Sequence, residues 1–362
     1  MTSPGPAIDV VINNHNYAEF LEAAIESARD QTYDRVKVIV VDDGSRDRSR
    51  EILAGQRADV AVILKENGGQ ASALNAGMAE SEGDVVIFLD ADDVLRPDVA
   101  ARVAEAFAAD ETLSKVQFRM ETIDAEGRPI GEIKPAPHLP MPSGDLREAE
   151  LAYPYDLVWM ATSANAFRVE ALRRILPIPE SSYPVTGADW YLVHLTALLG
   201  RVASLDLVGV GYRVHDRNSY ELVDARVDLP HLRQAVEFAA ATSRQLLRLA
   251  EELGQPHPER ILSLADLANR MTSLRLDPAH HPITTDRRRG LLLDSVEACR
   301  RRDNASLPMK GVFVAWFAAM AIAPRRLARQ LAELFMFPSR RRRLNRLLGR
   351  LQGAGREAQA VA

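Results

Sequence analysis

The sequence predicts an α/β protein: a Rossmann-like mixed sheet with helices on both faces, followed by an all-helical C-terminal extension. Three observations support this fold class. Short apolar segments alternate with helical segments over about the first 110 residues, a hairpin signal follows, and the chain from about Pro230 carries only helical patterns. Strands that alternate with helices form βαβ units, which favour a mostly parallel sheet.

Four strands and four helices are predicted in the N-terminal part. Each strand is a short run of apolar, mostly β-branched residues, as in Val36–Val41. Ser45 and Asp47 are candidate N-caps of the second helix. The first helix has apolar residues at helical spacing on one face, namely Phe20, Leu21, Ala24, Ile25 and Ala28. The predicted strands are residues 9–13, 36–41, 60–64 and 85–89, and the predicted helices are residues 18–31, 45–54, 70–81 and 96–109.

The pattern changes after Lys115. Two apolar segments, 116–123 and 130–133, flank Asp124-Ala125-Glu126-Gly127, which predicts a β-hairpin. The segments that follow are a proline-rich loop at 135–143, a helix at 187–199, and one or two strands at 202–212.

The C-terminal region predicts a helical extension, with helices at 232–253, 258–276, 287–301 and 312–337. Residues 338–350 carry six arginines and no acidic residue. Two interpretations stay open: a packed helical subdomain with a solvated basic tail, or a basic amphipathic segment on an anionic membrane surface. The first is the simpler interpretation, and the aromatic residues Phe313, Trp316, Phe317, Phe335 and Phe337 are compatible with the second.

The bulk composition of the 362 residues restricts the function. The net charge of -5 argues against general nucleic-acid binding. Cys299 is the single cysteine, so no internal disulfide is possible, which fits a reducing compartment. The N-terminus lacks the basic and apolar regions of a secretory signal, and no apolar stretch reaches the roughly 18 residues of a membrane-spanning helix. We therefore expect a cytoplasmic protein, with peripheral contact to the inner face of a membrane left open.

The fourth predicted strand ends in two carboxylates, Asp90 and Asp92. In open α/β sheets, ligands bind beyond the carboxyl ends of the strands. Hard divalent cations take oxygen ligands and bridge to substrate phosphates, so the pair predicts a metal–diphosphate site. An acidic turn that begins the next helix would give the same short pattern, and Asp-x-Asp alone does not separate the two interpretations.

Polar loops also follow the first three predicted strands. They are Asn13–Tyr17, Asp42–Ser45 and Glu66–Gln70. Because parallel strands present their carboxyl ends at one edge of a sheet, these loops should converge on the edge that carries Asp90 and Asp92. Their polar side chains and glycines could recognise a base and a ribose. Four such loops in succession favour the nucleotide-site interpretation.

Residues 8 to about 220 resemble a family 2 glycosyltransferase with the GT-A fold. The matching segments are Val-Val-Ile-Asn-Asn-His-Asn-Tyr (10–17), Val-Val-Asp-Asp-Gly-Ser (40–45), Asn-Gly-Gly-Gln-Ala-Ser-Ala-Leu-Asn-Ala-Gly (67–77), Phe-Leu-Asp-Ala-Asp-Asp (88–93), Gly-Ala-Asp-Trp (187–190) and Tyr-Arg-Val-His-Asp-Arg-Asn-Ser (212–219). The resemblance implies a catalytic domain of residues 1–228, with a nucleotide-binding half at about 8–110 and an acceptor-side half at about 111–228. It does not explain the helical extension, residues 229–362.

The resemblance implies roles for the donor-site residues. Asp43 would hydrogen-bond the nucleotide base, Asn75 would face the nucleotide or the donor sugar, and Asp90 would contact the ribose or a metal-bound water. Asn13 stands where many members have proline. The other donor-site candidates are Asn16, Asp42, Asn67, Gly68, Gln70 and Ala91.

The resemblance also implies the metal ligands and the base. Asp92 would ligate a divalent cation, Mn²⁺ or Mg²⁺. His215 lies where related enzymes place a second ligand or a diphosphate contact. Asp189 would be the catalytic base; it follows Ala188, where many members have glutamate.

The implied activity is metal-dependent, inverting transfer of a sugar from a nucleotide-diphosphate sugar to an acceptor hydroxyl. UDP is the default nucleotide, with dTDP and GDP open, and the acceptor would be a growing glycan, a lipid-linked saccharide or a small metabolite in cell-envelope, capsule or other glycan biosynthesis. Two alternatives remain: a donor-binding or assembly module without catalysis, and a sugar nucleotidyltransferase, which usually has a Gly-x-Gly-x-Arg loop after the first strand. The sequence identifies neither the sugar nor the oligomeric state, and the helical extension could form a dimer interface.

Overall fold

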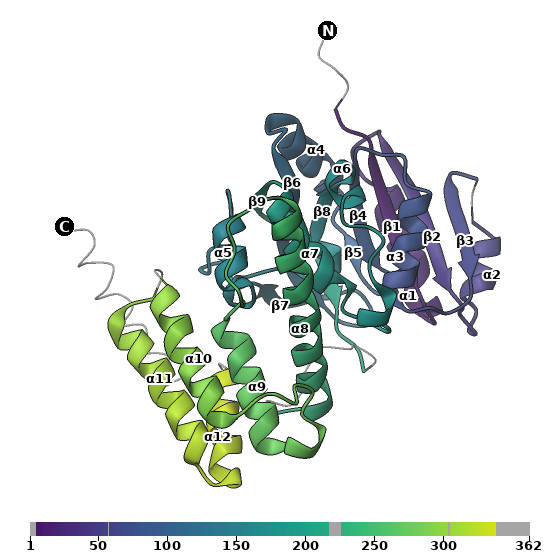
Figure 1. The fold of residues 1–362 in the computed structure, drawn as a ribbon. Coiled ribbons are helices and arrows are strands. Elements are labelled where there is room, and N and C mark those ends of the chain that lie inside the picture. The colour runs from purple at the N-terminus through teal and green to yellow at the C-terminus, as the bar shows by residue number, and fades with distance from the viewer. Residues whose placement is uncertain (1–4, 57, 217–225, 303–304, 338–362) are drawn as a thin grey trace. The chain divides into compact units, whose positions relative to one another are not determined.

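The computed structural model describes residues 5–56, 58–216, 226–302 and 305–337 (Figure 1). The chain divides into two compact units. The first, which we call the sheet unit, comprises Met1–Glu148 and Val158–Ser219; the second, the helical unit, comprises Ala149–Leu157 and Tyr220–Ala362. The short segment Ala149–Leu157 therefore belongs to the helical unit, although the sequence pattern placed it inside the expected catalytic domain.

The sheet unit is built on a nine-stranded mixed sheet of order β3-β2-β1-β4-β8-β6-β9-β5, with β7 paired to β6. The first four strands are parallel to their neighbours, whereas β4–β8, β6–β8, β6–β7 and β5–β9 are antiparallel pairs and β6–β9 is parallel. The mixed α/β sheet predicted from the sequence is thus confirmed. The strands are β1 (Ile8–Asn14), β2 (Val36–Asp43), β3 (Val60–Lys65), β4 (Val85–Asp90), β5 (Val94–Leu95), β6 (Leu113–Ile123), β7 (Pro129–Lys134), β8 (Asn165–Arg168) and β9 (Arg201–Arg213).

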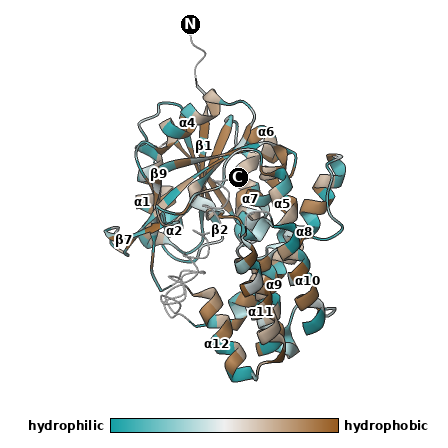
Figure 2. Ribbon diagram, turned by 90° about the vertical axis from the view of Figure 1, so that its left-hand side faces the viewer, coloured by the Kyte–Doolittle hydropathy of each residue, from teal (hydrophilic) through white to brown (hydrophobic). Residues whose placement is uncertain are grey.

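Helices cover both faces of the parallel strands, because successive side chains of a strand point to opposite faces. Val10 and Ile12 share a core cluster with residues of α1 (Ala18–Arg29). On the other face, a Cβ atom on Gly77 of α3 (Gln70–Ala79) would lie 2.3 Å from Cγ1 of Val11. The central strands are accordingly drawn mostly in brown in Figure 2. The remaining helical segments of this unit are α2 (Ser49–Ala54), α4 (Val99–Ala109), η2 (Thr162–Ala164), α6 (Val169–Arg173), η3 (Glu180–Ser182) and α7 (Ala188–Leu199).

Neither Ser45 nor Asp47 occupies the N-cap position of α2, although Oδ1 of Asp47 accepts the backbone N–H of Ser49, the first residue of the helix, at 2.9 Å. The helix begins at Ser49, and its N-cap position is Arg48, which makes no side-chain cap. Ser45 instead accepts a hydrogen bond from the backbone N–H of Asn16 at 2.9 Å, and Asp47 accepts one from the N–H of Ala18 at 2.9 Å. Both side chains therefore fasten the β1–α1 loop to the β2–α2 loop.

The helical unit contains α8 (Leu229–Glu252), α9 (Leu264–Leu276), η4 (Pro278–His280), α10 (Arg288–Arg301), α11 (Leu307–Ile322) and α12 (Arg325–Met336). The single helix predicted for 312–337 is wrong: Ala323 and Pro324 separate α11 from α12. Proline lacks the N–H that would continue the ladder and restricts the residue before it, so α11 ends there. The basic segment 338–350 lies outside the described residues, and in the part that is described no helix is long and apolar enough to cross a membrane.

A buried ion network holds the helical unit together. Arg270 on α9 pairs with Asp266 at 3.4 Å and with Asp286. Asp156, in η1 (Pro154–Asp156), accepts hydrogen bonds from the first backbone N–H groups of α9 at 2.8 and 3.0 Å and pairs with Arg302 at 3.2 Å. A carboxylate at a helix N-terminus satisfies otherwise unpaired N–H groups. This contact explains why Ala149–Leu157 belongs to the helical unit. The segment contains the end of α5 (Arg147–Ala152), whose first two residues belong to the sheet unit.

Candidate active site

The carboxyl end of β4 meets the loops after β1 and β3, as the parallel order of the strands predicts. Asn13 and Asp90 are register partners on adjacent strands. Nδ2 of Asn13 donates to Oδ1 of Asp90 at 2.9 Å, and Nε2 of Gln70 donates to the same oxygen at 3.1 Å. Three predicted donor-site residues therefore lie together at one edge of the sheet.

Gln70 also connects this edge to α7, which carries Asp189. Its Oε1 accepts the backbone N–H of Ala188 at 3.2 Å, and its own N–H donates to the carbonyl of Val185 at 3.0 Å. Asp189 lies in the first turn of α7, where its Oδ1 accepts the N–H of Trp190 at 2.9 Å. The N-cap position of α7 is Gly187, so Asp189 does not occupy it.

The cluster concentrates negative charge. Burial, followed by repulsion from Asp92, raises the pKa of Asp90 to about 7; Asp189 adds to the rise, while the hydrogen bonds from Asn13 and Gln70 oppose it. Burial, followed by repulsion from Asp92 and Asp90, holds the pKa of Asp93 well above its usual range. Burial also raises the pKa of Asp189. A bound cation reverses such shifts because it favours the charged carboxylates.

Asp92 and His215 form a close pair that could share a metal ion. Nε2 of His215 lies 3.1 Å from Oδ2 of Asp92, and the two side chains are only 5% and 12% exposed. The imidazole ring packs on Tyr17 and Phe20, with centroid distances of 5.6 and 4.9 Å. Within the described ranges, no group of three or more His, Cys, Asp or Glu side chains is placed to hold a metal. One carboxylate and one imidazole nevertheless fit a Mn²⁺ or Mg²⁺ ion that takes its remaining ligands from a diphosphate and water.

Arg213, at the end of β9, fixes the acidic turn. Its backbone N–H donates to Oδ1 of Asp93 at 3.0 Å, and its Nε donates to the carbonyl of Asp92 at 2.7 Å. The Arg217-Asn218-Ser219 part of the same motif lies outside the described residues.

The Asp-Asp-Gly-Ser loop after β2 binds the loop between β3 and α3. Asp43 accepts three hydrogen bonds, from Nζ of Lys65 at 2.6 Å and from the backbone N–H groups of Gly68 and Gly69 at 2.9 and 2.7 Å. Gly44 has φ +74, and a Cβ atom there would lie 2.5 Å from the backbone nitrogen of Asn67. Only glycine fits this approach of the two loops. Asp43 thus holds the β3–α3 loop in place.

The family model described as Glycosyl transferase family 2 matches residues 9–176, which contain β1 to β8 and these loops. Residues 9–176 belong to glycosyl transferase family 2. A curated relative, an uncharacterized glycosyltransferase of Nostoc sp., is 35% identical over 217 residues, which is 59% of this chain and 66% of the relative. The chain spans between 13% and 66% of the length of the first curated relatives that it matches.

Solved structures support the same fold. TarS of S. aureus in complex with UDP-GlcNAc has a TM-score of 0.51 and 13% identity, with 91% of both chains covered. The mannosyltransferase PcManGT of Pyrobaculum calidifontis, in complex with GDP-Man and Mn²⁺, has a TM-score of 0.50 and 18% identity, with 92% of this chain and 86% of that chain covered. The chain therefore has a GT-A fold. The family match and the curated relatives identify residues 9–176 as a glycosyltransferase domain.

The glycosyltransferase domain places several predicted residues in supporting positions. Asp42 is fully buried and accepts hydrogen bonds from Asn14, Ser45 and Arg50 at 2.9, 3.2 and 2.9 Å. Asn75 bonds the backbone N–H and carbonyl of Ile178 at 2.8 and 3.0 Å, which directs its amide toward that loop.

Two further predicted residues connect loops. Asn16 has φ 60, and its Oδ1 accepts the N–H of Arg46 at 2.7 Å. Ala91 donates its N–H to the carbonyl of Asn13 at 3.2 Å, so it continues the pairing of β4 with β1.

His15 is a residue of this site that its sequence pattern did not single out. Its Nδ1 lies 2.7 Å from the carbonyl of Asp43, and its Nε2 lies 2.8 and 3.0 Å from the side-chain amides of Asn16 and Asn67. A carbonyl only accepts, so Nδ1 carries the proton and Nε2 accepts. His15 thus connects the loops after β1, β2 and β3. The only sequence signal was its place between Asn14 and Asn16 in a polar loop.

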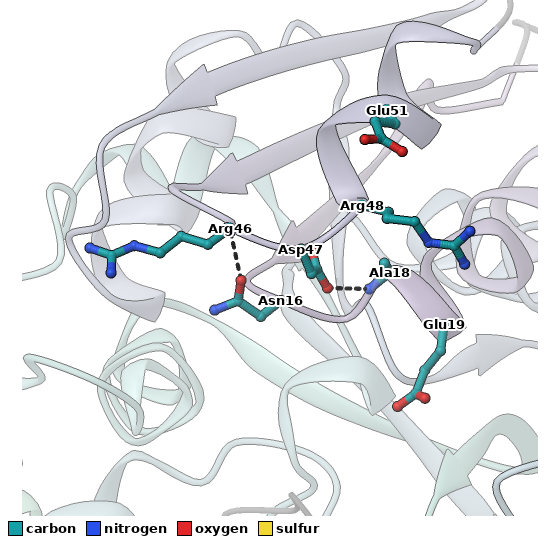
Figure 3. A pocket seen from close by; sticks show the side chains of 7 residues that line it. All are labelled: Asn16, Ala18, Glu19, Arg46, Asp47, Arg48 and Glu51. Carbon is teal, nitrogen blue, oxygen red and sulfur yellow. Dashed lines mark hydrogen bonds between the residues drawn. The ribbon is translucent and has the colours of Figure 1, made fainter.

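A cavity of about 390 Å³ opens beside the β1–α1 and β2–α2 loops (Figure 3). The side chains of Arg46 and Arg48 point away from each other in it, so they do not form a common anion site. None of the candidate catalytic carboxylates lines this cavity. Its lining residues are Asn16, Ala18, Glu19, Arg46, Asp47, Arg48 and Glu51.

Proposed function

We propose that the family 2 domain transfers a sugar from a nucleotide-diphosphate sugar to an acceptor hydroxyl, in a metal-dependent reaction that inverts the anomeric carbon. One observation carries this proposal. Gln70 hydrogen-bonds both Asp90 and the backbone beside Asp189, so that the candidate donor-site carboxylate and the candidate base share one edge of the sheet. In this proposal residues 8–110 bind the donor, residues 111–228 bind the acceptor, and residues 229–362 are an extension.

The donor would lie along the carboxyl ends of β1, β2 and β4. Asp43 and the β3–α3 loop that it anchors would face the base. Oδ1 of Asn13 is buried and, among the described residues, accepts no hydrogen bond, so it could accept one from a ribose hydroxyl. UDP is the default nucleotide. The ligands named for TarS and PcManGT, UDP-GlcNAc and GDP-Man, support the class of donor rather than one base.

Asp92 and His215 would hold a Mn²⁺ or Mg²⁺ ion. Such an ion, when bound, would act as a Lewis acid that neutralises the charge on the leaving diphosphate. Burial, and after it repulsion from Asp92, raises the pKa of Asp90, which fits a site completed by a cation because a cation favours the charged carboxylates.

Asp189 would take the proton of the acceptor hydroxyl. Burial raises its pKa, which makes the carboxylate a stronger base than an exposed aspartate. The hydroxyl oxygen then bonds to the anomeric carbon as the bond to the diphosphate breaks, so one displacement gives inversion and no covalent enzyme intermediate forms. The acceptor would be a growing glycan, a lipid-linked saccharide or a small metabolite in glycan biosynthesis.

A calorimetric screen of UDP, GDP and dTDP sugars, each with Mn²⁺ or Mg²⁺, tests the donor site. We expect one nucleotide class to bind only with metal, and Asp92→Ala to lose that binding. Asp34→Ala, which removes an exposed aspartate outside the cluster, is the matched control. If the folded protein binds none of these donors, the proposed donor site is wrong.

Product analysis separates the alternatives. Release of a nucleoside diphosphate with sugar transfer or hydrolysis supports the glycosyltransferase. Donor binding without any release, in the presence of metal and a panel of acceptors, supports a module without catalysis. Pyrophosphate release from a nucleoside triphosphate and a sugar phosphate would indicate a nucleotidyltransferase.

A further inference from the structure

The exposed face of α11 is apolar from one end to the other. Leu307 and Ile322, at its two ends, are 83% and 84% exposed, and Val312 between them is 37% exposed. The exposed residues of this helix recur on one side at helical spacing: Leu307, Pro308, Gly311, Val312, Ala315 and Ile322. Lys310 is the single charged residue of α11. A continuous apolar stripe of this kind marks an interaction surface.

The aromatic residues of α11 and α12 pack against each other. Trp316 stacks on Phe335 with ring centroids 4.4 Å apart, and its Nε1 donates to the carbonyl of Leu331 at 2.9 Å. Phe317 is fully buried, and Phe313 lies against Phe335. These rings pack α11 onto α12 and are not the exposed apolar residues that the sequence suggested for membrane contact.

The exposed side of α12 also carries apolar residues, and it adds arginines. It carries Arg325, Arg326, Leu327, Gln330 and Leu334, with Leu327 and Leu334 46% and 38% exposed. Glu333, the single acidic residue of the helix, is buried at 8% exposure. The exposed residues of α11 and α12 therefore combine apolar side chains and arginines, without a carboxylate. This composition is typical of helices that lie in the interface of an anionic bilayer.

We propose that the exposed faces of α11 and α12, which we call the α11–α12 face, dock on an anionic lipid surface. A second copy of the chain is a poorer occupant, because a symmetric contact would bring the arginines of both copies together with no exposed carboxylate to pair with them. The sequence beyond α12 has the same character: residues 338–350 contain six arginines and no acid. Apolar residues would enter the headgroup region while the arginines meet the anionic headgroups.

Vesicle co-sedimentation of the full chain tests this inference. We expect binding to vesicles of phosphatidylglycerol and phosphatidylcholine, weaker binding to phosphatidylcholine alone, and a decrease as salt rises. The double substitution Leu307→Glu with Ile322→Glu should reduce binding about tenfold, since it places two anions in the apolar stripe. The control is Ile130→Glu, which makes the same change at a residue that is 55% exposed on β7 and should bind as the unchanged protein does.

Three results would overturn the inference. They are unchanged vesicle binding by the double variant, no binding by the unchanged chain, and loss of binding only when residues 338–362 are removed, which would assign the contact to that segment. A concentration-dependent dimer that the double variant abolishes, without any vesicle binding, would assign the face to a second copy. Donor binding measured in solution on the same variants keeps this test separate from the proposed function, because α11 and α12 lie outside the family 2 match.

Discussion

Nε2 of His215 lies 3.1 Å from Oδ2 of Asp92, although 123 positions separate the two residues in the chain. Antiparallel pairing of β5 with β9 brings the end of β9 beside the acidic turn after β4. Arg213, two residues before His215 in the chain, then bonds the side chain of Asp93 and the carbonyl of Asp92. The two predicted metal ligands therefore reach each other through the register of the second half of the sheet.

Replacing His215 tests whether it serves as a ligand. We expect His215→Ala to weaken metal-dependent donor binding about 10- to 100-fold, the range found when a metal site loses a supporting group. His215→Phe should behave in the same way, because it keeps the ring contacts with Tyr17 and Phe20 but has no nitrogen. Calorimetry of the donor at several Mn²⁺ concentrations gives both affinities. A Phe variant with normal metal dependence would show that the ring serves packing alone.

Asp189→Asn should lower kcat about 10²- to 10⁴-fold while donor affinity stays unchanged, because it removes the base and keeps the shape. A base must be ionised, and burial raises the pKa of Asp189 above the usual 3.8. Activity should therefore fall as the pH drops through a pKa above that value. A pH profile of kcat/KM checks this point. Full kcat in the Asn variant would exclude Asp189 as the base.

His15→Ala should raise the KM for the donor more than it lowers kcat. The substitution releases three loops that face the proposed base site without touching the carboxylates around Asp90. His138→Ala, which removes an exposed histidine elsewhere in the sheet unit, is the matched control. Steady-state kinetics with the donor identified by the screen gives both constants. Equal effects of the two variants would contradict a role for His15 in ordering these loops.

Gly69→Ala should destabilise the protein more than Gly131→Ala does. Both glycines have φ near the left-handed region, +85 and +83, but a Cβ atom on Gly69 would lie 2.1 Å from the carbonyl oxygen of Pro184, whereas nothing lies within 4 Å at Gly131. The control variant carries only the backbone strain, about 1–2 kcal/mol. Gly69→Ala also forces the loop before α7 away from Gln70, so kcat should fall with Tm. Calorimetric Tm values that decrease equally in both variants would show that the loop moves at no cost.

Local patterns were enough to predict the first half of the sheet. The four parallel strands are short apolar runs, and their observed bounds differ from the predicted ones by at most two residues at either end. The rule that parallel strands share a carboxyl edge then placed Asn13, Gln70 and Asp90 together. Prediction failed where a short residue pattern is compatible with two local structures. Ser45 suits an N-cap, yet it bonds Asn16 in the β1–α1 loop, and Asp47 bonds both Ala18 in that loop and Ser49 at the start of α2. Pro324 ends a helix whose apolar pattern continues through it.

The sequence by itself determined the family of residues 9–176, the alternation of strands and helices, and the polar residues available at the sheet edge, because each depends on neighbours in the chain. Only the tertiary structure decided which of those residues meet. It paired Asp92 with His215, joined Gln70 to α7, turned Asn75 toward Ile178, and exposed one apolar side of α11 while burying its aromatic side. These relationships depend on strand register and helix packing between distant segments, which residue spacing does not encode.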